Sequence, residues 1–497
     1  MTRVWVRELA GWLGALALAL IVTGQVAASA RSELLFRDGD SLIVALFAQS
    51  ALSGEPSHWA MSSVLFLPET AVFAGLDLIL PVDVNGLLAA SAVVNILAFY
   101  GALRMAAGRR RRVTAPVSWA LIGTAALGVL AMTETSSSRD ALELASLLLT
   151  TTYYSATVIA VVLAVGLIRR FVERRKRGAG PLLALAFVAA LSTLSNPLFA
   201  VWATVPLTIV LAGLARRSAT RSRMLPALAV LIAATALGLI GRMPFSAWIA
   251  NTGAGYAQPA LWVESVGYYA ALLGDRVTTP LGIIGTLLSL GLLAFAAVRS
   301  MRVHEPAERV VALAAWVIPV LVLLGAIALG THAARYLQPL AFAPVLALVA
   351  APRALAIPRP RPIIATVAVL LLAGSALSVP RLVSAAHAPD ADLTCVTDWV
   401  SSSGRTGAGQ FWTVRLPKLH LDDRTQLVQV DHRLNGYAWL VNRTDFDVGE
   451  VSFLIEDAQT VEWQLPLDIA PDAIVDCGRY RILDFGSTPL PLGPQHS

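Results

Sequence analysis

About eleven apolar segments, each long enough to cross a lipid bilayer, constrain this chain more than any other feature of its sequence. Hydrophobic residues make up 56% of its 497 residues and charged residues only 14%, a balance that soluble domains do not have. The sequence therefore predicts a polytopic α-helical membrane protein. The predicted spans are residues 8–29, 86–107, 114–132, 145–168, 181–195, 198–214, 224–242, 279–298, 309–330, 337–355 and 363–380.

The basic residues between these spans predict how the chain crosses the membrane. Nearly all of them are arginines, and their clusters fall on one side of the membrane, which the positive-inside rule makes cytoplasmic. The N-terminus is then cytoplasmic, and the residues after the last span are extracytoplasmic, in a protein of the plasma membrane. The net charge of +6 thus reports topology, not a nucleic-acid partner. The clusters are Arg3 with Arg7, residues 109–112, 169–177 and 216–223, Arg299 with Arg302, and Arg353 with Arg359 and Arg361.

Two apolar stretches between the first two spans are expected to form helices at the outer membrane interface. They cover residues 42–52 and 62–80. A full span at 62–80 would move the arginine cluster at 109–112 to the outside, and Pro68 and Glu69 disfavour a segment exposed to lipid. These helices therefore belong to the first outer loop.

The first apolar segment has an alternative interpretation as a cleaved signal peptide. Basic residues precede it, and Ala28-Ser29-Ala30 resembles a cleavage site. Cleavage would leave every later loop on the same side of the membrane.

The chain changes character near residue 380. Residues 1–380 form the predicted membrane module, and residues 381–497 are predicted to form an extracytoplasmic α+β domain. Charged residues become frequent there, a helix is expected near 393–403, and apolar residues alternate with polar ones in a way typical of strands. The predicted strands lie at 412–416, 425–430, 451–455 and 479–483.

Both cysteines of the chain, Cys395 and Cys477, lie in this tail. In an oxidising compartment they could form a disulfide between the first helix and the last strand of the domain. The alternative is two unrelated buried thiols. Zinc is not expected, because no pair of histidines stands nearby at ligand spacing.

Asp38 and Asp40 are the strongest chemical signal in the sequence. They flank Gly39 just beyond the first span, so their carboxylates can converge on one point and serve as a general base or as weak ligands for a divalent cation. The alternative is ordinary polarity of an outer loop. No other cofactor or metal is predicted.

The first outer loop resembles that of the GT-C glycosyltransferases, and the bacterial branch similar to dolichyl-phosphate-mannose transferases is nearest. The resemblance rests on an N-terminal span followed by the motif at 37–41, the turn at 55–59 and the segment 62–69. It implies a membrane enzyme that transfers a sugar from a polyprenyl-phosphate donor to an envelope glycan, lipid or protein, with inversion and with no or weak dependence on metal. It also implies that Asp38 or Asp40 is the catalytic base.

Several other residues are candidates for binding this donor or the acceptor. Arg335 can grip a phosphate bidentately, and His332 and Tyr336 can donate further hydrogen bonds. For these residues and for Trp59 the alternative is anchoring at the membrane interface. The remaining predicted binding residues are His58, Trp59, Glu69, Glu134, Arg139 and Arg242.

Two other classes of protein remain open at this point. A lipid or solute transporter usually carries ionisable residues or broken helices near the middle of the membrane. The later spans here are nearly free of charge, and the acidic residues collect on one face, which favours chemistry at a surface. A scaffold without enzymatic activity, with a tail that binds cell-envelope polymer, is the third possibility.

Overall fold

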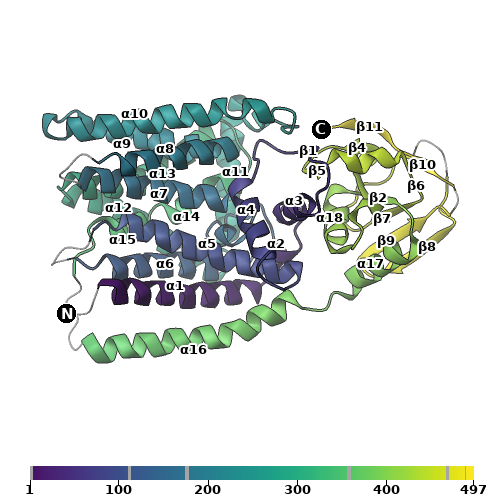
Figure 1. Cartoon of the computed structure of the whole chain (residues 1–497), viewed down its shortest axis with the longest axis horizontal. Helices are drawn as coiled ribbons and strands as arrows, with labels where there is room; N and C mark the ends of the chain where they lie inside the picture. The colour runs from purple at the N-terminus through teal and green to yellow at the C-terminus, as the bar shows by residue number, and fades with distance from the viewer. Residues whose placement is uncertain (1–3, 110–113, 174–177, 355–359, 466–468, 487) are drawn as a thin grey trace. The chain divides into compact units, whose positions relative to one another are not determined.

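A computed structural model describes residues 4–109, 114–173, 178–354, 360–465, 469–486 and 488–497 (Figure 1). Arg3 and the parts of the arginine clusters at 110–112, 174–177 and 359 lie outside the described residues. The chain divides into two compact units. The first unit comprises Met1–Leu34, Ala89–Met243 and Gly255–Ala386, and the second comprises Leu35–Leu88, Pro244–Ala254 and His387–Ser497.

Within the described ranges, 7 helices are long and apolar enough to cross a membrane. This confirms the prediction of a polytopic helical protein, while the count of eleven spans stays a prediction. In the first unit α1 packs against α6 and α16, and α13 contacts α7, α9 and α12 (Figure 1). The long helices are α1 (Val4–Ala27), α5 (Val84–Ala106), α7 (Ser155–Glu173), α10 (Ser218–Ile240), α12 (Pro280–Arg302), α13 (Pro306–Ala328) and α16 (Pro360–Ala386).

Shorter elements connect these helices. Four predicted spans correspond to apolar helical stretches of fewer than 18 residues, at 116–132, 180–195, 200–215 and 334–350. The short elements are α2 (Ser32–Phe36), α6 (Pro116–Met132), α8 (Gly180–Ser195), η2 (Ala200–Thr204), α9 (Val205–Ala215), η3 (Met243–Phe245), η4 (Ala254–Tyr256), η5 (Pro259–Leu261) and α11 (Trp262–Arg276).

Two predicted spans are wrong as continuous helices. The segment expected from residue 145 contains η1 (Ser146–Leu149) and then irregular backbone, and α7 begins only at Ser155. The segment expected at 337–355 is broken into η6 (Ala334–Leu337), α14 (Pro339–Phe342) and α15 (Leu346–Ala350). Prolines lack the backbone donor that a continuous helix needs, and three consecutive threonines at 150–152 are poor helix formers. Hydrophobicity alone does not show that prolines or a run of threonines interrupt a helix.

The C-terminal part of the second unit is built on a mixed sheet of 7 strands in the order β11-β4-β3-β2-β7-β9-β8. Its centre is parallel, since β3 and β7 both run parallel to β2. Helices α17 (Ala391–Ser403) and α18 (Phe411–His420) pack on the sheet, and α18 makes the crossover between β2 and β3 (Figure 1). The strands are β2 (Gly407–Gln410), β3 (Leu427–Val430), β4 (Asn435–Tyr437), β7 (Phe453–Glu456), β8 (Ala473–Cys477), β9 (Tyr480–Asp484) and β11 (Gly493–His496).

The predicted strand at 412–416 is wrong, because these residues lie in α18. The helix predicted near 393–403 is α17, and the strands predicted around 427, 453 and 480 are β3, β7 and β9. A five-residue apolar alternation does not distinguish a strand from one turn of helix. Here the segment is helical because it connects the parallel strands β2 and β3, and such a connection needs a crossover, usually a helix.

Alternating side chains of the sheet fill two hydrophobic cores. Phe453 and Ile455 pack with Val396 and Val414 of the two helices, whereas Leu454 points to the opposite core. The segment between α3 and α4 contributes to this second core through Ala60. Thus a residue from the N-terminal part of the chain belongs to the core of the tail.

Backbone pairing joins three distant stretches of chain into the second unit. Strand β1 (Trp59–Ala60) pairs antiparallel with β5 (Val441–Asn442), and Met61 bridges to Ile249. The two helices predicted in the first outer loop are present as α3 (Ile43–Leu52) and α4 (Leu67–Asp77), which pack against each other. The remaining elements are η7 (Arg424–Gln426), η8 (Arg443–Val448) and the paired strands β6 (Glu450–Val451) and β10 (Leu490–Pro491).

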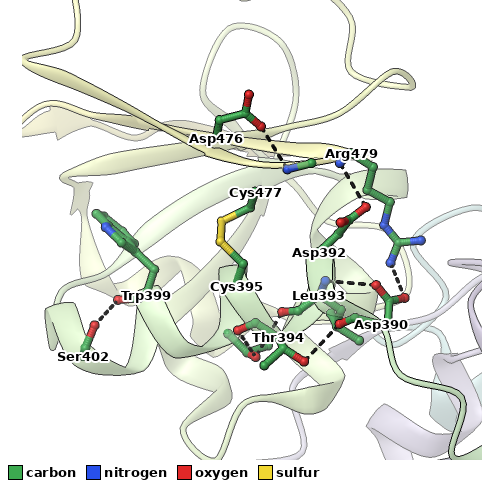
Figure 2. The surroundings of a disulfide bond; sticks show 12 residues. Asp390, Asp392, Leu393, Thr394, Cys395, Trp399, Ser402, Asp476, Cys477 and Arg479 are labelled. Atoms are coloured by element: carbon green, nitrogen blue, oxygen red, sulfur yellow. Dashed lines mark hydrogen bonds and ion pairs between the residues drawn. A yellow bond between two sulfur atoms is a disulfide. The ribbon is translucent and has the colours of Figure 1, made fainter.

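A disulfide joins Cys395 of α17 to Cys477 of β8, with 5.5 Å between the two Cα atoms (Figure 2). The prediction placed the bridge at the last strand of the domain. This is wrong, because β9, β10 and β11 follow β8. Next to the bridge, Arg479 donates from its guanidinium to Asp390 and from its backbone to Asp392 (Figure 2). Both contacts fix the start of α17 against the β8–β9 turn.

Replacing Cys395 and Cys477 together with serine is expected to destabilise the tail by about 4 kcal/mol, because the bridge closes a long loop in the unfolded chain. Thermal unfolding of the purified full-length protein, with and without reductant, measures this loss. Reductant should lower the melting temperature of the wild type and leave that of the double variant unchanged. Equal melting temperatures for the wild type and the double variant would contradict the expectation.

Candidate functional site

The segment Asp38-Gly39-Asp40-Ser41, here called the aspartate turn, directly precedes α3. The Asp40 amide donates to Oδ1 of Asp38 at 3.2 Å, and the Ser41 amide donates to the Asp38 carbonyl at 2.8 Å. Both aspartates are half-buried, and Gly39 between them is buried. The local hydrogen bonds are those of an Asx turn, which fixes the Asp38 side chain against the backbone of Asp40.

A single arginine of the tail holds this turn. Arg415 of α18 donates from Nη1 to the Gly39 carbonyl at 2.8 Å and from Nη2 to the Leu440 carbonyl. Its guanidinium lies over the ring of Phe411, 4.3 Å from the ring centroid. Leu440 has a left-handed backbone (φ 52°), which is costly for a leucine and is therefore maintained by its surroundings.

Arg415 is only 1% exposed. Burial lowers its pKa to about 10, and the negative charges of Asp40 and Asp38 oppose this shift. The guanidinium therefore stays charged at neutral pH, and both carboxylates are close enough to act on it. A buried cation next to two carboxylates can keep them anchored while one of them takes a proton from a substrate.

Sequence reasoning did not identify Arg415. The predicted strand at 412–416 would have given it an outward position, and its contact with Gly39 spans 376 positions of sequence. The available signal was weak: Phe411 and Arg415 stand four residues apart, a spacing that places both side chains on one face only if the segment is helical.

His58 and Trp59 lie in the same unit as the aspartate turn. His58 is exposed, while Trp59 is 4% exposed, donates to Ser50 at 3.3 Å and packs on Phe47. A cavity of about 30 Å³ next to Trp59 holds about one water molecule and is too small for a sugar ring. Trp59 therefore serves the packing of this unit, and sugar stacking at this ring would require the pocket to open.

A second buried cation lies close to Arg415. Lys418 donates to Asp445 at 2.8 Å and to the carbonyls of Arg424 and Leu427, at 2.9 and 2.7 Å. Burial raises the pKa of Asp445, and the Lys418 charge opposes this shift. All three protons of the Lys418 ammonium group are thus used within the tail. Its charge neutralises Asp445 and so stabilises the η8 segment.

The first unit has its own buried charged network, centred on Arg31. Its guanidinium donates to Ser146 at 2.9 Å and to the Glu143 carbonyl at 2.8 Å, and it also bonds the carbonyls of Ser136 and Ser138. Glu134, predicted to bind substrate, accepts the amides of Ala145 and Ser146 and lies 3.9 Å from both Arg31 and Arg276. At 2% exposure its carboxylate caps η1 and fixes the segment between α6 and α7.

Arg335 lies among aromatic residues in the first unit. It is 3.9 Å from Asp140, and its guanidinium lies over Tyr336, 5.7 Å from the ring centroid. Tyr336 is stacked on Tyr154, and His332 contacts Tyr268 edge to face. The predicted trio of His332, Arg335 and Tyr336 therefore lies within an aromatic cluster.

Three irregular backbone segments converge behind this cluster. Tyr154 has φ 66°, Gln338 donates to the Tyr153 carbonyl at 2.9 Å, and Trp202 of the π-helical segment η2 packs on Tyr154. Strained and π-helical backbone is enriched at functional sites. Such backbone is tolerated in a membrane module where it is buried in protein or lines a polar cavity.

The remaining predicted residues have these positions. Arg242 donates to the Leu194 carbonyl at 2.7 Å, Arg139 is half-buried between α6 and η1, and Glu69 is 8% exposed in the first turn of α4. Asp38, Asp40, His58, Trp59 and Glu69 belong to the second unit, and the other predicted binding residues belong to the first. A pocket shared by Arg335 and the aspartates stays a prediction.

Across the described ranges, no group of three or more His, Cys, Asp or Glu side chains is arranged to hold a metal ion. Asp38 and Asp40 together supply two carboxylates, whereas Mg²⁺ and Ca²⁺ take six or more oxygen ligands. A cation bound there would keep most of its water ligands, as expected for a weak site.

His420, at the end of α18, predicts a pH dependence of stability. Burial lowers its pKa, Asp83 and Asp390 oppose this shift, and Arg37 adds to it. The unfolded chain then binds more protons below about pH 6.5, so the native state should lose stability as pH falls below that value. His420→Gln should reduce this loss, measured by melting temperature between about pH 7 and pH 5. His304 is exposed, so His304→Gln is the matched control, and its melting temperature should change with pH as that of the wild type does. If the melting temperature of His420→Gln changes with pH as much as that of the wild type, the assignment to His420 is wrong.

Arg31→Met should destabilise the first unit by about 3 to 5 kcal/mol, because it removes the cation next to the buried carboxylate of Glu143 and leaves Glu134 with Arg276 alone. Hydrogen exchange across residues 133–146 and thermal unfolding in detergent measure the effect. Arg104→Met is the matched control: its partner Glu8 is 34% exposed, so the loss should be about 1 kcal/mol or less. Equal losses in the two variants would show that burial does not set the strength of the network.

No protein-family model matches this chain, and it matches neither a curated protein nor a solved structure. The case for a function therefore depends on the chemistry of its own residues.

Proposed function

We propose that this protein is a membrane glycosyltransferase that moves a sugar from a polyprenyl-phosphate donor to an acceptor outside the cytoplasm. The observation that carries the proposal is the aspartate turn: two half-buried carboxylates flank a glycine whose carbonyl is bonded to a buried, charged guanidinium. A general base has to be held in a fixed position to be effective.

The chemistry is a single displacement. One aspartate accepts the proton of an acceptor hydroxyl while the hydroxyl oxygen forms a bond to the anomeric carbon of the donor sugar. The bond from that carbon to the phosphate oxygen breaks, and its electron pair leaves with the polyprenyl phosphate. The anomeric centre is inverted, and the proton ends on the aspartate or in solvent.

The departing phosphate gains negative charge, which a cation can stabilise. Within the first unit, Arg335 is the candidate for binding a phosphate, with Tyr336 and His332 as additional donors. Its partner Asp140 is 55% exposed and 3.9 Å away, so their ion pair is weak. A phosphate could replace this carboxylate at the guanidinium and bind it bidentately.

The architecture agrees with this proposal. Seven described helices are apolar enough to cross a membrane, as access to a lipid-linked donor requires. The Cys395–Cys477 disulfide fits a tail in an oxidising compartment outside the cytoplasm. Because the donor is already activated as a glycosyl phosphate, the transfer needs no bound nucleotide.

Asp38→Asn and Asp40→Asn test the proposal. The variant that removes the base should lower transfer by about 10² to 10⁴-fold while the protein still folds, because asparagine cannot accept the proton. Purified protein in lipid nanodiscs would be given polyprenyl-phosphate hexoses and pentoses, and products would be identified by mass spectrometry. Asp447→Asn, an exposed position in the same unit, is the matched control. If both aspartate variants fold and retain full transfer, the proposal is wrong.

A further inference from the structure

We infer that Arg415 is a positioning residue for the aspartate turn, so that the C-terminal tail is a working part of the catalytic unit and not an appended binding domain. The inference rests on the proposed function, because it assigns Arg415 a role toward the carboxylates that the function uses. It also makes a structural statement that can be tested without any activity.

The two hydrogen bonds of Arg415 connect the first outer loop to the tail. Nη1 reaches the Gly39 carbonyl at 2.8 Å, and Nη2 reaches the Leu440 carbonyl at the start of β5. The bond to Gly39 is made to the backbone between the two aspartates, so it restrains the peptide from which both side chains project. This is how a positioning residue acts, since it orients the reacting groups through the peptide that carries them.

The guanidinium itself has little freedom to move. Phe411 covers one face of it, and the whole side chain is 1% exposed. On the side of the turn, a Cβ added to Gly39 would come within 3.2 Å of the Trp412 ring and 3.5 Å of Cδ of Arg415. The close approach of α18 to the turn therefore depends on glycine at position 39.

The other buried cation of α18 is not available to replace Arg415. Lys418, on the same helix, is occupied by Asp445 and two carbonyls. Arginine is always charged and presents its donors in a rigid fork, whereas lysine is a single point of charge. Loss of Arg415 would leave the Gly39 and Leu440 carbonyls without this donor and would remove a positive charge that acts on Asp38 and Asp40.

The experiment compares Arg415→Met and Arg415→Lys with Arg405→Met in the full-length protein. Arg405 is a matched control, because it also pairs bidentately, with Asp484 at 2.8 Å, and also lies over an aromatic ring, that of Trp399. Its partners all belong to the tail. Hydrogen exchange of peptides covering residues 36–42 reports the turn, and kcat and KM with a polyprenyl-phosphate sugar report catalysis.

Arg415→Met should speed exchange in residues 36–42 and lower kcat by about 10²-fold, with a much smaller change in KM, as expected for a misplaced base. Arg415→Lys should recover part of the loss. Arg405→Met should speed exchange near residues 403–407 and 484–486 only, and keep kcat within about twofold of the wild type. If Arg415→Met does not fold, Gly39→Ala provides the second test, since its Cβ pushes on Trp412 while Arg415 is kept; it should lower kcat in the same direction.

The two arms separate this inference from the proposed function. Unchanged exchange in residues 36–42, or unchanged kcat in a folded Arg415→Met protein, would overturn the positioning role. An equal fall of kcat in Arg405→Met would also overturn it, because the effect would then be one of tail stability. If the wild type transfers no sugar from any donor while exchange in Arg415→Met rises as expected, the proposed function fails, and Arg415 still holds the turn.

Discussion

The buried guanidinium of Arg415 is the interaction on which the second unit depends. Removing a charge of this kind from water costs several kcal/mol, and only a complete set of partners offsets that cost. Two carbonyls, an aromatic face and the charges of two aspartates provide this set. Because three of these five partners come from the aspartate turn and two from the tail, the conformations of the two segments depend on each other.

This dependence gives the aspartate turn a property that a surface loop lacks. Outer loops with short acidic pairs are usually solvated and mobile, and their side chains sample many directions. Here Gly39 is buried, its carbonyl is bonded to Arg415, and strand pairing between β1 and β5 joins the same two chain segments a short distance away. A carboxylate held in this way is preorganised, which is the physical basis for assigning it a chemical role.

Sequence patterns predicted the parts of this protein that hydrophobicity controls, and missed the parts that polar contacts control. The long apolar helices, α17 and the strands β3, β7 and β9 follow from periodicity. The irregular backbone at 150–154 and the breaks at 334–350 do not, because threonine and proline leave the hydrophobic signal intact while removing helical hydrogen bonds. Asp38 and Asp40 were identifiable from their place after the first apolar segment. Arg415 was not, since a local alternation misassigned its helix and its partner lies in another part of the chain.

The polar contacts that escaped prediction share one physical form in both units. Arg31 bonds the carbonyls of Ser136, Ser138 and Glu143, and Lys418 bonds those of Arg424 and Leu427, as Arg415 bonds those of Gly39 and Leu440. Each buried cation donates to several backbone carbonyls at once, and a buried carbonyl is costly to remove from water unless it accepts a hydrogen bond. A loop folded around such a cation acquires a defined shape without regular secondary structure. The loops of this protein can therefore hold reactive side chains as firmly as its helices do, and the cation at the centre of each loop is the residue that sets its geometry.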